Sequence, residues 1–280
     1  MTGMGGGSLM TPILVIAFGF KPTYAVGTDI FHGAIFKTFG ALRHRRLGTV
    51  HARLAAWMFL GSGPLSLLGV ATATWIKHRY GATAQNVEGY AVGAALVAGG
   101  LGFLAKGFIK RGVQPSSKAL YLSRREKIIA VTIGAVFGFV VGLTSVGSGT
   151  FFGLVMVLVY PLTLPTIVGT DIFHAAALLW VAGIGHVVGG NVDFHATAWL
   201  LTGSIPGILI SSRFTVRLPQ VLLRAALGIT LTLSGIKLLK VPQANWILGI
   251  GLGLLGAALA GYGVRALLTR PRVSAHVEGA

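Results

Sequence analysis

The heptapeptide VGTDIFH occurs twice in this chain, at residues 26–32 and at residues 168–174. The two copies are 142 positions apart, and further identities keep the same spacing on both sides of them. These further identities include the pairs Gly7/Gly149, Gly48/Gly190, Trp57/Trp199 and Pro64/Pro206. Two unrelated apolar segments would not share seven consecutive residues and also keep these further identities at the same spacing. The chain therefore contains an internal duplication.

The residues around both copies are too apolar for a soluble protein. Of the 280 residues, 54% are hydrophobic and 10% are charged, whereas soluble domains have about 25% charged residues. The chain has 42 glycines, and glycine is more frequent in membrane helices than in soluble ones. Residues 128–170 contain no Asp, Glu, Lys, Arg or His. The composition predicts an all-α polytopic membrane protein with about 8–10 transmembrane segments, since about 20 helical residues cross a bilayer.

The distribution of Lys and Arg predicts how the two halves are oriented. The apolar stretch at 128–160 is too long for one crossing and should break at its glycines between residues 145 and 149. If the chain turns back there, one side of the membrane carries 16 Lys and Arg residues and the other carries 5. The positive-inside rule then places the richer side in the cytoplasm. The halves would be inverted-topology repeats with glycine-broken helices, an architecture typical of secondary transporters.

This pattern divides the chain into four parts. We expect a first transmembrane repeat at residues 1–109, a cytoplasmic linker at 110–127, a second transmembrane repeat at 128–240, and an extra helix with a tail at 241–280. The second repeat has an apolar stretch before its glycines, whereas the first repeat begins at its glycines. The first repeat is therefore expected to be short at its N-terminus.

Four ionisable residues in the repeated heptapeptides are the candidates for proton coupling: Asp29, His32, Asp171 and His174. Residues three positions apart share a helix face, so each Asp and its His would form one polar patch inside an apolar span. Ionisable groups are costly there and usually face a cavity or a partner, and histidine changes its charge near neutral pH. Each Asp could instead cap an unwound helix start after Gly27 or Gly169, or each Asp–His pair could only join the repeats.

The glycine clusters, with the polar residues beside them, are the candidates for substrate binding. The candidate set is Gly5, Gly6, Gly7, Thr28, Gly147, Ser148, Gly149 and Thr170. Glycine lets the backbone leave helical geometry and approach a ligand, and the N–H groups of a broken helix attract an anion. Close helix packing through small residues is the alternative. Lys37, whose counterpart is Leu179, is a candidate charge partner for the anion if it faces inward; if it faces outward, it reaches the basic loop.

The same motifs resemble those of a known family. MGGGSLMTPIL at 4–14, AVGTDIFH at 25–32, HRRLGTV at 44–50, GLTSVGSGTFFGL at 142–154 and VGTDIFHAA at 168–176 look like the sulfite exporter TauE/SafE family. The resemblance implies a bacterial inner-membrane carrier of sulfite, organosulfonates or other small anions, generally taken to be linked to protons. It carries over onto the glycine clusters at 5–7 and 147–149 and onto residues 28–32 and 170–174.

We therefore expect a secondary transporter that moves a small anion, such as sulfite, an organosulfonate or a carboxylate, together with protons. A divalent-metal carrier is the alternative, since two Asp-x-x-His patches could offer four oxygen and nitrogen ligands. An enzyme is not expected, because the sequence contains no HExxH-type site and suggests no nucleophile–base pair. No cofactor and no resident metal are expected.

The net charge of +17 has an explanation other than nucleic-acid binding. The basic residues fall mainly in short stretches between apolar segments, which is typical of cytoplasmic loops. We expect contacts with membrane lipid and none with nucleic acid, and a homo-oligomer is compatible with the sequence.

Overall fold

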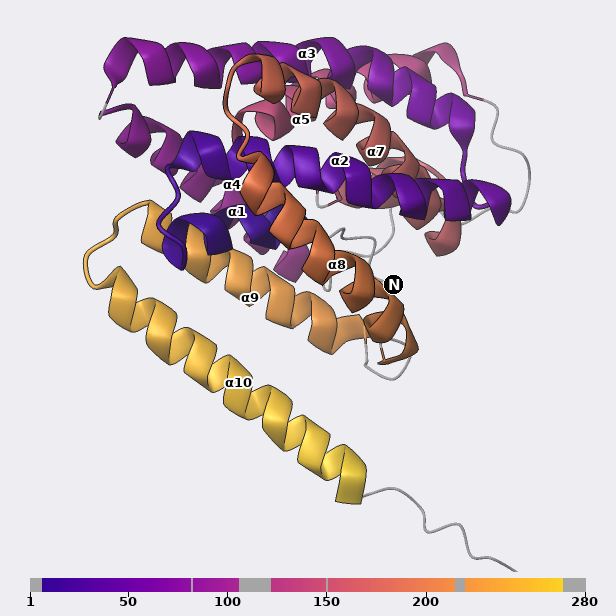
Figure 1. The fold of residues 1–280 in the computed structure, drawn as a ribbon. Coiled ribbons are helices and arrows are strands. Elements are labelled where there is room, and N and C mark those ends of the chain that lie inside the picture. The colour runs from indigo at the N-terminus through magenta and orange to yellow at the C-terminus, as the bar shows by residue number, and fades with distance from the viewer. Residues whose placement is uncertain (1–6, 82, 106–121, 150, 215–219, 269–280) are drawn as a thin grey trace, which may run out of the picture.

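The computed structural model describes residues 7–81, 83–105, 122–149, 151–214 and 220–268. All regular elements in these ranges are helices, as the sequence predicts (Figure 1). They are α1 (Gly7–Ile16), α2 (Pro22–Arg46), α3 (Ala52–Tyr80), α4 (Ala84–Ala105), α5 (Arg124–Thr144), α6 (Phe151–Val159), α7 (Leu164–Val188), α8 (Phe194–Phe214), α9 (Gln220–Leu238) and α10 (Ala244–Leu268).

Several of these helices are suited to a bilayer. Within the described residues, α3, α4, α5 and α7 are long and apolar enough to cross a membrane, and shorter apolar stretches lie at Ala225–Leu238 and Ala244–Ala258. Large apolar side chains such as Leu60, Val136 and Trp246 are exposed on the outside of the helices. Lipid accommodates such a surface and water does not. The chain is a multi-pass membrane protein, and the expected 8–10 crossings stay a prediction.

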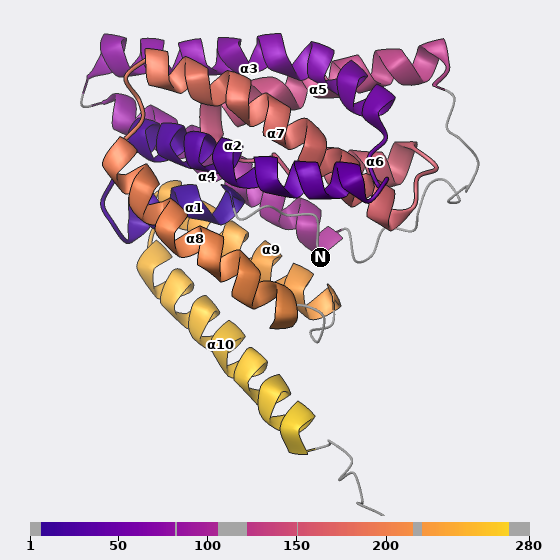
Figure 2. The same ribbon diagram turned by 45° about the vertical axis from the view of Figure 1, so that its right-hand side comes forward.

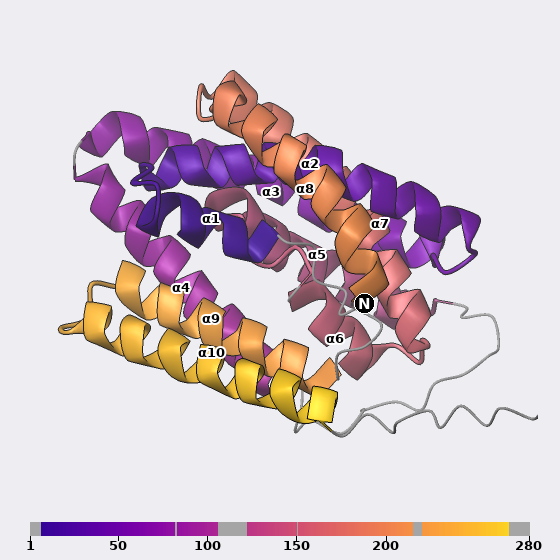
Figure 3. The ribbon, with the colours of Figure 1, turned by 60° about the horizontal axis from the view of Figure 1, so that its bottom comes forward.

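The duplication in the sequence is also a duplication of helices. When the chain is shifted by 142 positions, α2 coincides with α7, α3 begins where α8 begins, and α1 and α4 overlap α6 and α9. Among the described helices, α5 and α10 have no counterpart. Helix α10 packs mainly along α9, at the edge of the molecule (Figures 1 and 3).

Equivalent helices from the two halves pair with each other in opposite directions. Gly33 of α2 lies against Leu179 of α7, and Gly40 lies against Ile172, so α2 and α7 are antiparallel. Helices α4 and α9 pair in the same antiparallel way. Two inverted repeats would produce such pairs, although the orientation of each half in the bilayer stays a prediction.

The long apolar stretch at 128–160 breaks at the predicted glycines. Helix α5 ends at Thr144, and Ser145 then adopts a left-handed conformation with φ of 62°. Gly147 has φ of 120°, which residues with a side chain rarely adopt. Helix α6 folds back along α5. The ring of Phe151, at the start of α6, stacks on the ring of Phe137 of α5, with the centroids 5.0 Å apart.

Helix α5 begins at Arg124, inside the linker predicted at 110–127. The side chain of Ser123 accepts a hydrogen bond from the backbone of Glu126, and the Glu126 side chain accepts one from the backbone of Ser123. This capping box extends the helix into polar residues, which is why apolar patterning places its start too late. Residues 110–121 of the predicted linker lie outside the described residues, as does the tail at 269–280.

Helices α3 and α5 form the most extensive helix pair, and glycines permit their close approach (Figure 2). A Cβ atom on Gly61 would collide with the backbone of Val131, and one on Gly69 would collide with the backbone of Phe139, so the two helices run parallel. The equivalent of Gly61 in α8 is Gly203, whose added Cβ would meet no described atom within 4 Å. In the described structure, α5 therefore covers the glycine face of α3, and no described helix covers the equivalent face of α8.

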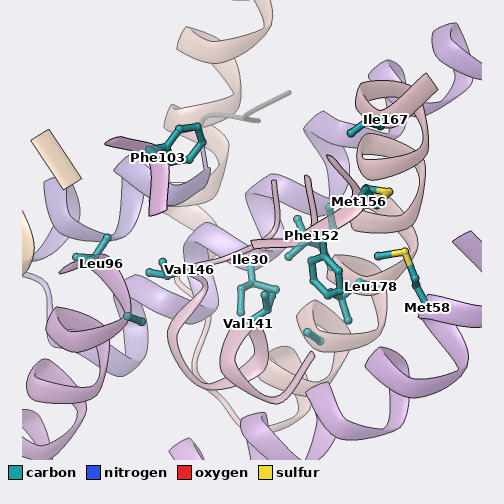
Figure 4. Packing of buried hydrophobic residues seen from close by; sticks show 14 of the residues in the cluster. Ile30, Met58, Leu96, Phe103, Val141, Val146, Phe152, Met156, Ile167 and Leu178 are labelled. Carbon is teal, nitrogen blue, oxygen red and sulfur yellow. The ribbon is translucent and has the colours of Figure 1, made fainter. Parts of the chain in front are cut away.

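The apolar core lies where α2, α3, α5, α6 and α7 meet (Figure 4). Ile30, Met58, Val141, Phe152 and Leu178 contribute buried side chains to it. Ile30 directly follows the first heptapeptide aspartate. The core therefore places both heptapeptides in the interior of the molecule rather than on its lipid-facing surface.

Candidate functional site

The four ionisable residues of the heptapeptides are all buried. Asp29 and His32 lie on α2, and Asp171 and His174 lie on α7. Each Asp stands in the second turn of a regular helix, because α2 begins at Pro22 and α7 begins at Leu164. Neither Asp caps an unwound helix start.

Gly27 and Gly169 serve close packing between the repeats instead of breaking their helices. A Cβ atom on Gly27 would collide with the carbonyl oxygen of Asn191, and one on Gly169 would collide with that of Thr49. Asn191 and Thr49 are themselves 142 positions apart. The two contacts are therefore the same contact made once by each repeat.

Asp29 connects the two glycine regions. Its Oδ2 atom accepts a hydrogen bond of 2.6 Å from the hydroxyl of Thr11 on α1 and one of 2.8 Å from the hydroxyl of Ser145 at the break. Its Oδ1 atom is buried and has no hydrogen-bond partner in the described part of the chain. An acceptor in this position is available to a proton or to a hydrogen-bond donor.

Lys37 faces inward, which settles the choice that the sequence leaves open. Its side chain is 3% exposed, and its Nζ atom donates to the carbonyl oxygen of Ser148 at 2.8 Å and to the hydroxyl of Ser148 at 2.9 Å. Its charge interacts with the carboxylates of Asp171 and Asp29. The interior thus contains one ammonium group and two carboxyl groups beside the glycine break.

The two heptapeptide histidines make symmetric contacts across the repeats. His174 Nε2 is 2.8 Å from the hydroxyl of Ser62 on α3, and His32 Nε2 is 2.9 Å from the hydroxyl of Ser204 on α8. The Nδ1 atoms of both histidines are buried without a hydrogen-bond partner among the described residues. The side-chain hydrogen bonds of both histidines therefore go to serines of the opposite repeat. The pattern Ser-x-Pro, which occurs at equivalent positions in both halves, was the available signal for these serines.

Thr28 and Thr170 also make symmetric contacts, with the loops that join the helices. The Thr28 hydroxyl accepts the backbone N–H of Asp193 at 3.0 Å, and the Thr170 hydroxyl accepts that of His51 at 2.9 Å. Each hydroxyl thus accepts a hydrogen bond from a backbone N–H group of a loop. Each hydroxyl still has its own O–H group to donate, so the assignment of Thr28 and Thr170 to substrate binding stays a prediction.

The two glycine clusters are described to different extents. Gly5 and Gly6 lie outside the described residues, and Gly7 is the first residue of α1. Gly147, Ser148 and Gly149 are buried at the break after α5. The break that the structure describes is therefore the one that Lys37 holds.

Two further contacts between helices and loops were not predicted from the sequence. The hydroxyl of Thr23, in the first turn of α2, donates to the carboxylate of Glu88 on α4, and Glu88 is buried. Lys77 donates to the side chain of Asn191 at 2.8 Å and lies 4.6 Å from the centroid of the Tyr24 ring. The rarity of acidic residues, six in the chain, was the signal that could have singled out Glu88.

The described residues contain no group of three or more His, Cys, Asp or Glu side chains that could hold a metal ion. The two Asp-x-x-His patches therefore do not assemble into the four-ligand set of the metal-carrier alternative. The geometry gives that alternative no support.

Comparison with known proteins is consistent with this arrangement. The chain is 36% identical over 242 residues to the probable membrane transporter protein YjnA of Bacillus subtilis (strain 168), covering 85% of this chain and 93% of that protein. It is 24% identical over 238 residues to the probable membrane transporter protein YdhB of the same organism, again covering 85% and 93%. Both relatives are named as probable membrane transporters rather than as enzymes. No solved structure matches the chain significantly. Residues 1–238 match the family described as sulfite exporter TauE/SafE, and the chain belongs to that family.

Proposed function

We propose that this protein is a proton-coupled secondary transporter that moves a small anion, such as sulfite, an organosulfonate or a carboxylate, across the bacterial inner membrane. The observation that carries the proposal is the buried ammonium group of Lys37 at the glycine break. Anion sites need a positive charge or several N–H donors. Lys37 supplies the charge, and the backbone of residues 147–149 supplies N–H groups outside regular helix.

The charges around Lys37 support coupling to protons. With Lys37 protonated and both Asp29 and Asp171 ionised, the three groups carry one net negative charge. An entering anion would add a second one, and unpaired charge in a membrane interior costs several kcal/mol. A proton bound by each carboxyl group removes that cost. The anion should therefore enter together with protons.

The two histidines provide additional proton sites next to the carboxyl groups. His32 and His174 each use Nε2 on a serine and leave a buried Nδ1 without a described partner. Protonation at Nδ1 would add one positive charge at each site. We assign His32 and His174, with Asp29 and Asp171, to the uptake and release of protons.

The site is closed to solvent in this conformation. Asp29 and His174 are each 1% exposed, so an anion reaches them only after the helices move. The antiparallel pairs α2/α7 and α4/α9 give the two halves a common interface for such a movement. Alternating access about this interface is the mechanism that we propose.

Flux measurements in proteoliposomes test this function. An imposed pH gradient should drive sulfite from the more acidic side of the membrane to the less acidic side. Protons should cross with each anion, and a pH-sensitive dye should detect them. Lys37→Leu should abolish the flux. Lys21→Gln should not, because Lys21 is exposed outside the site. Sulfite flux that does not depend on the pH gradient would refute proton coupling, and unchanged flux in Lys37→Leu would refute the proposed site.

A further inference from the structure

We propose that a cavity at the cytoplasmic ends of α3 and α5 binds the headgroup of an anionic phospholipid. The cavity has a volume of about 420 Å³ and is lined by Arg53, Trp57, Leu122 and Lys127. Its lining residues are not among the buried groups on α2 and α7, and the transport mechanism proposed above does not use them.

Both cations of the cavity are held at the same end of the fold. Arg53 lies in the first turn of α3, and Lys127 lies in the first turn of α5. Because glycines bring these two helices into parallel backbone contact, their first turns stay side by side. This end also carries the basic residues of the α2 C-terminus, Arg43, Arg45 and Arg46. It is the end that the positive-inside rule assigns to the cytoplasm.

The charge around the cavity suits a phosphate group. Arg124 and Arg125 are exposed in the same turn as Lys127. The acidic residue of that turn is Glu126, and one of its carboxylate oxygens already accepts the backbone N–H of Ser123 at 2.8 Å. The carboxylate stays negatively charged, but Arg53, Lys127 and the two exposed arginines outnumber it, so the charge around the cavity is positive. Arginine and lysine are the side chains that most often bind phosphate.

The floor of the cavity distinguishes a lipid from free phosphate. Trp57 and Leu122 are half-buried and pack against the apolar core, and the ammonium of Lys127 lies 5.4 Å from the centroid of the Trp57 ring. A cationic rim above an apolar floor matches a headgroup that is attached to acyl chains. Tryptophan concentrates at membrane interfaces, and the cytoplasmic leaflet is the one rich in anionic lipid.

The equivalent position in the second repeat lacks this cationic rim. The counterparts of Arg53 and Trp57 are His195 and Trp199. The Trp199 Nε1 donates a hydrogen bond of 3.2 Å to His195 Nε2. Trp199 is 67% exposed. The tryptophan is therefore shared by both repeats, whereas the arginine of the first repeat is replaced by a histidine in the second.

Native mass spectrometry of the full-length protein in detergent tests the site. The probes are phosphatidylglycerol, phosphatidylcholine and inorganic phosphate. We expect phosphatidylglycerol to bind more tightly than phosphatidylcholine. We expect Arg53→Gln combined with Lys127→Gln to weaken its binding at least tenfold, since each cation near a membrane surface contributes a factor of about five. The charge-conserving pair Arg53→Lys with Lys127→Arg should retain most of the binding.

Lys21→Gln combined with Arg79→Gln is the matched control, because it removes the same charge from exposed positions at the opposite end. This control should bind phosphatidylglycerol as the unaltered protein does. Equal binding of the two lipids, an equal loss in the control, or unchanged binding in the Arg53/Lys127 glutamine variant would overturn the proposal. Displacement of the bound lipid by millimolar inorganic phosphate would overturn it as well, by identifying free phosphate as the ligand.

Discussion

The ammonium group of Lys37 donates hydrogen bonds to both the carbonyl oxygen and the hydroxyl of Ser148, at 2.8 and 2.9 Å. These residues are 111 positions apart, on α2 of the first repeat and in the glycine break of the second. The residue equivalent to Lys37 is Leu179. One repeat therefore supplies a cation and the other supplies the broken helix that it holds, so the duplicated site is chemically asymmetric.

Replacement of Lys37 by leucine, the residue at the equivalent position, should reduce sulfite flux by about 100-fold or more, because loss of a buried charge partner costs about 3–5 kcal/mol. Lys37→Arg keeps the charge in a larger planar group and should retain partial flux. Initial rates in proteoliposomes measure both, with size-exclusion profiles to confirm folding. Flux in Lys37→Arg as low as in a folded Lys37→Leu would show that charge alone does not explain the role of Lys37.

Asp29→Asn should flatten the pH dependence of transport. An asparagine carbonyl can still accept the hydroxyls of Thr11 and Ser145, but it cannot bind or release a proton. In the unaltered protein, protonation of the buried carboxylate removes a negative charge, so anion flux should rise as the pH falls from about 8 to about 6. Rates measured across this range should show that rise in the unaltered protein only. An unchanged pH profile in Asp29→Asn would remove Asp29 from the coupling mechanism.

Ser62→Ala should destabilise the protein more than Ser204→Ala, although the two serines are equivalent in the repeats. Ser62 and its partner His174 are both fully buried, so the variant leaves a buried nitrogen unpaired at a cost of about 1–3 kcal/mol. Ser204 is partly exposed, so its surroundings can adjust more easily to the loss of its hydroxyl beside His32. Thermal unfolding in detergent measures the difference. Equal losses, or the reverse order, would contradict it.

Gly61→Ala should likewise be harmful where Gly203→Ala is not. A methyl group on Gly61 collides with the backbone of Val131, and overpacking of this kind costs about 1–3 kcal/mol. A methyl group on Gly203 meets no described atom within 4 Å, and alanine is a better helix former than glycine by about 1 kcal/mol. Gly61→Ala should therefore lower the melting temperature, whereas Gly203→Ala should leave it unchanged or raise it. A melting temperature lowered equally in both would indicate that the Gly203 face is also packed.

Much of the architecture could be predicted from the sequence because it depends on local composition and on the repeat. Apolar runs predicted the helices, and the glycines at 147 and 149 predicted the break after α5. The start of α5 was placed too late, since the capping box at Ser123 and Glu126 lies in polar residues that an apolar pattern does not include. The number of crossings and their orientation stay predictions from charge distribution.

The sequence by itself determined that this is a membrane protein, that it contains two related halves, and that two of its six acidic residues lie in the repeated heptapeptides. Only the tertiary structure decided the partners of those charges. The rule that residues three positions apart share a face could pair Asp29 with His32. Asp29 instead accepts from Thr11 and from Ser145, 18 and 116 positions away, and His32 lies beside Ser204, 172 positions away. Hydrogen bonds depend on which helices pack together, and a pattern along one helix carries no record of that packing.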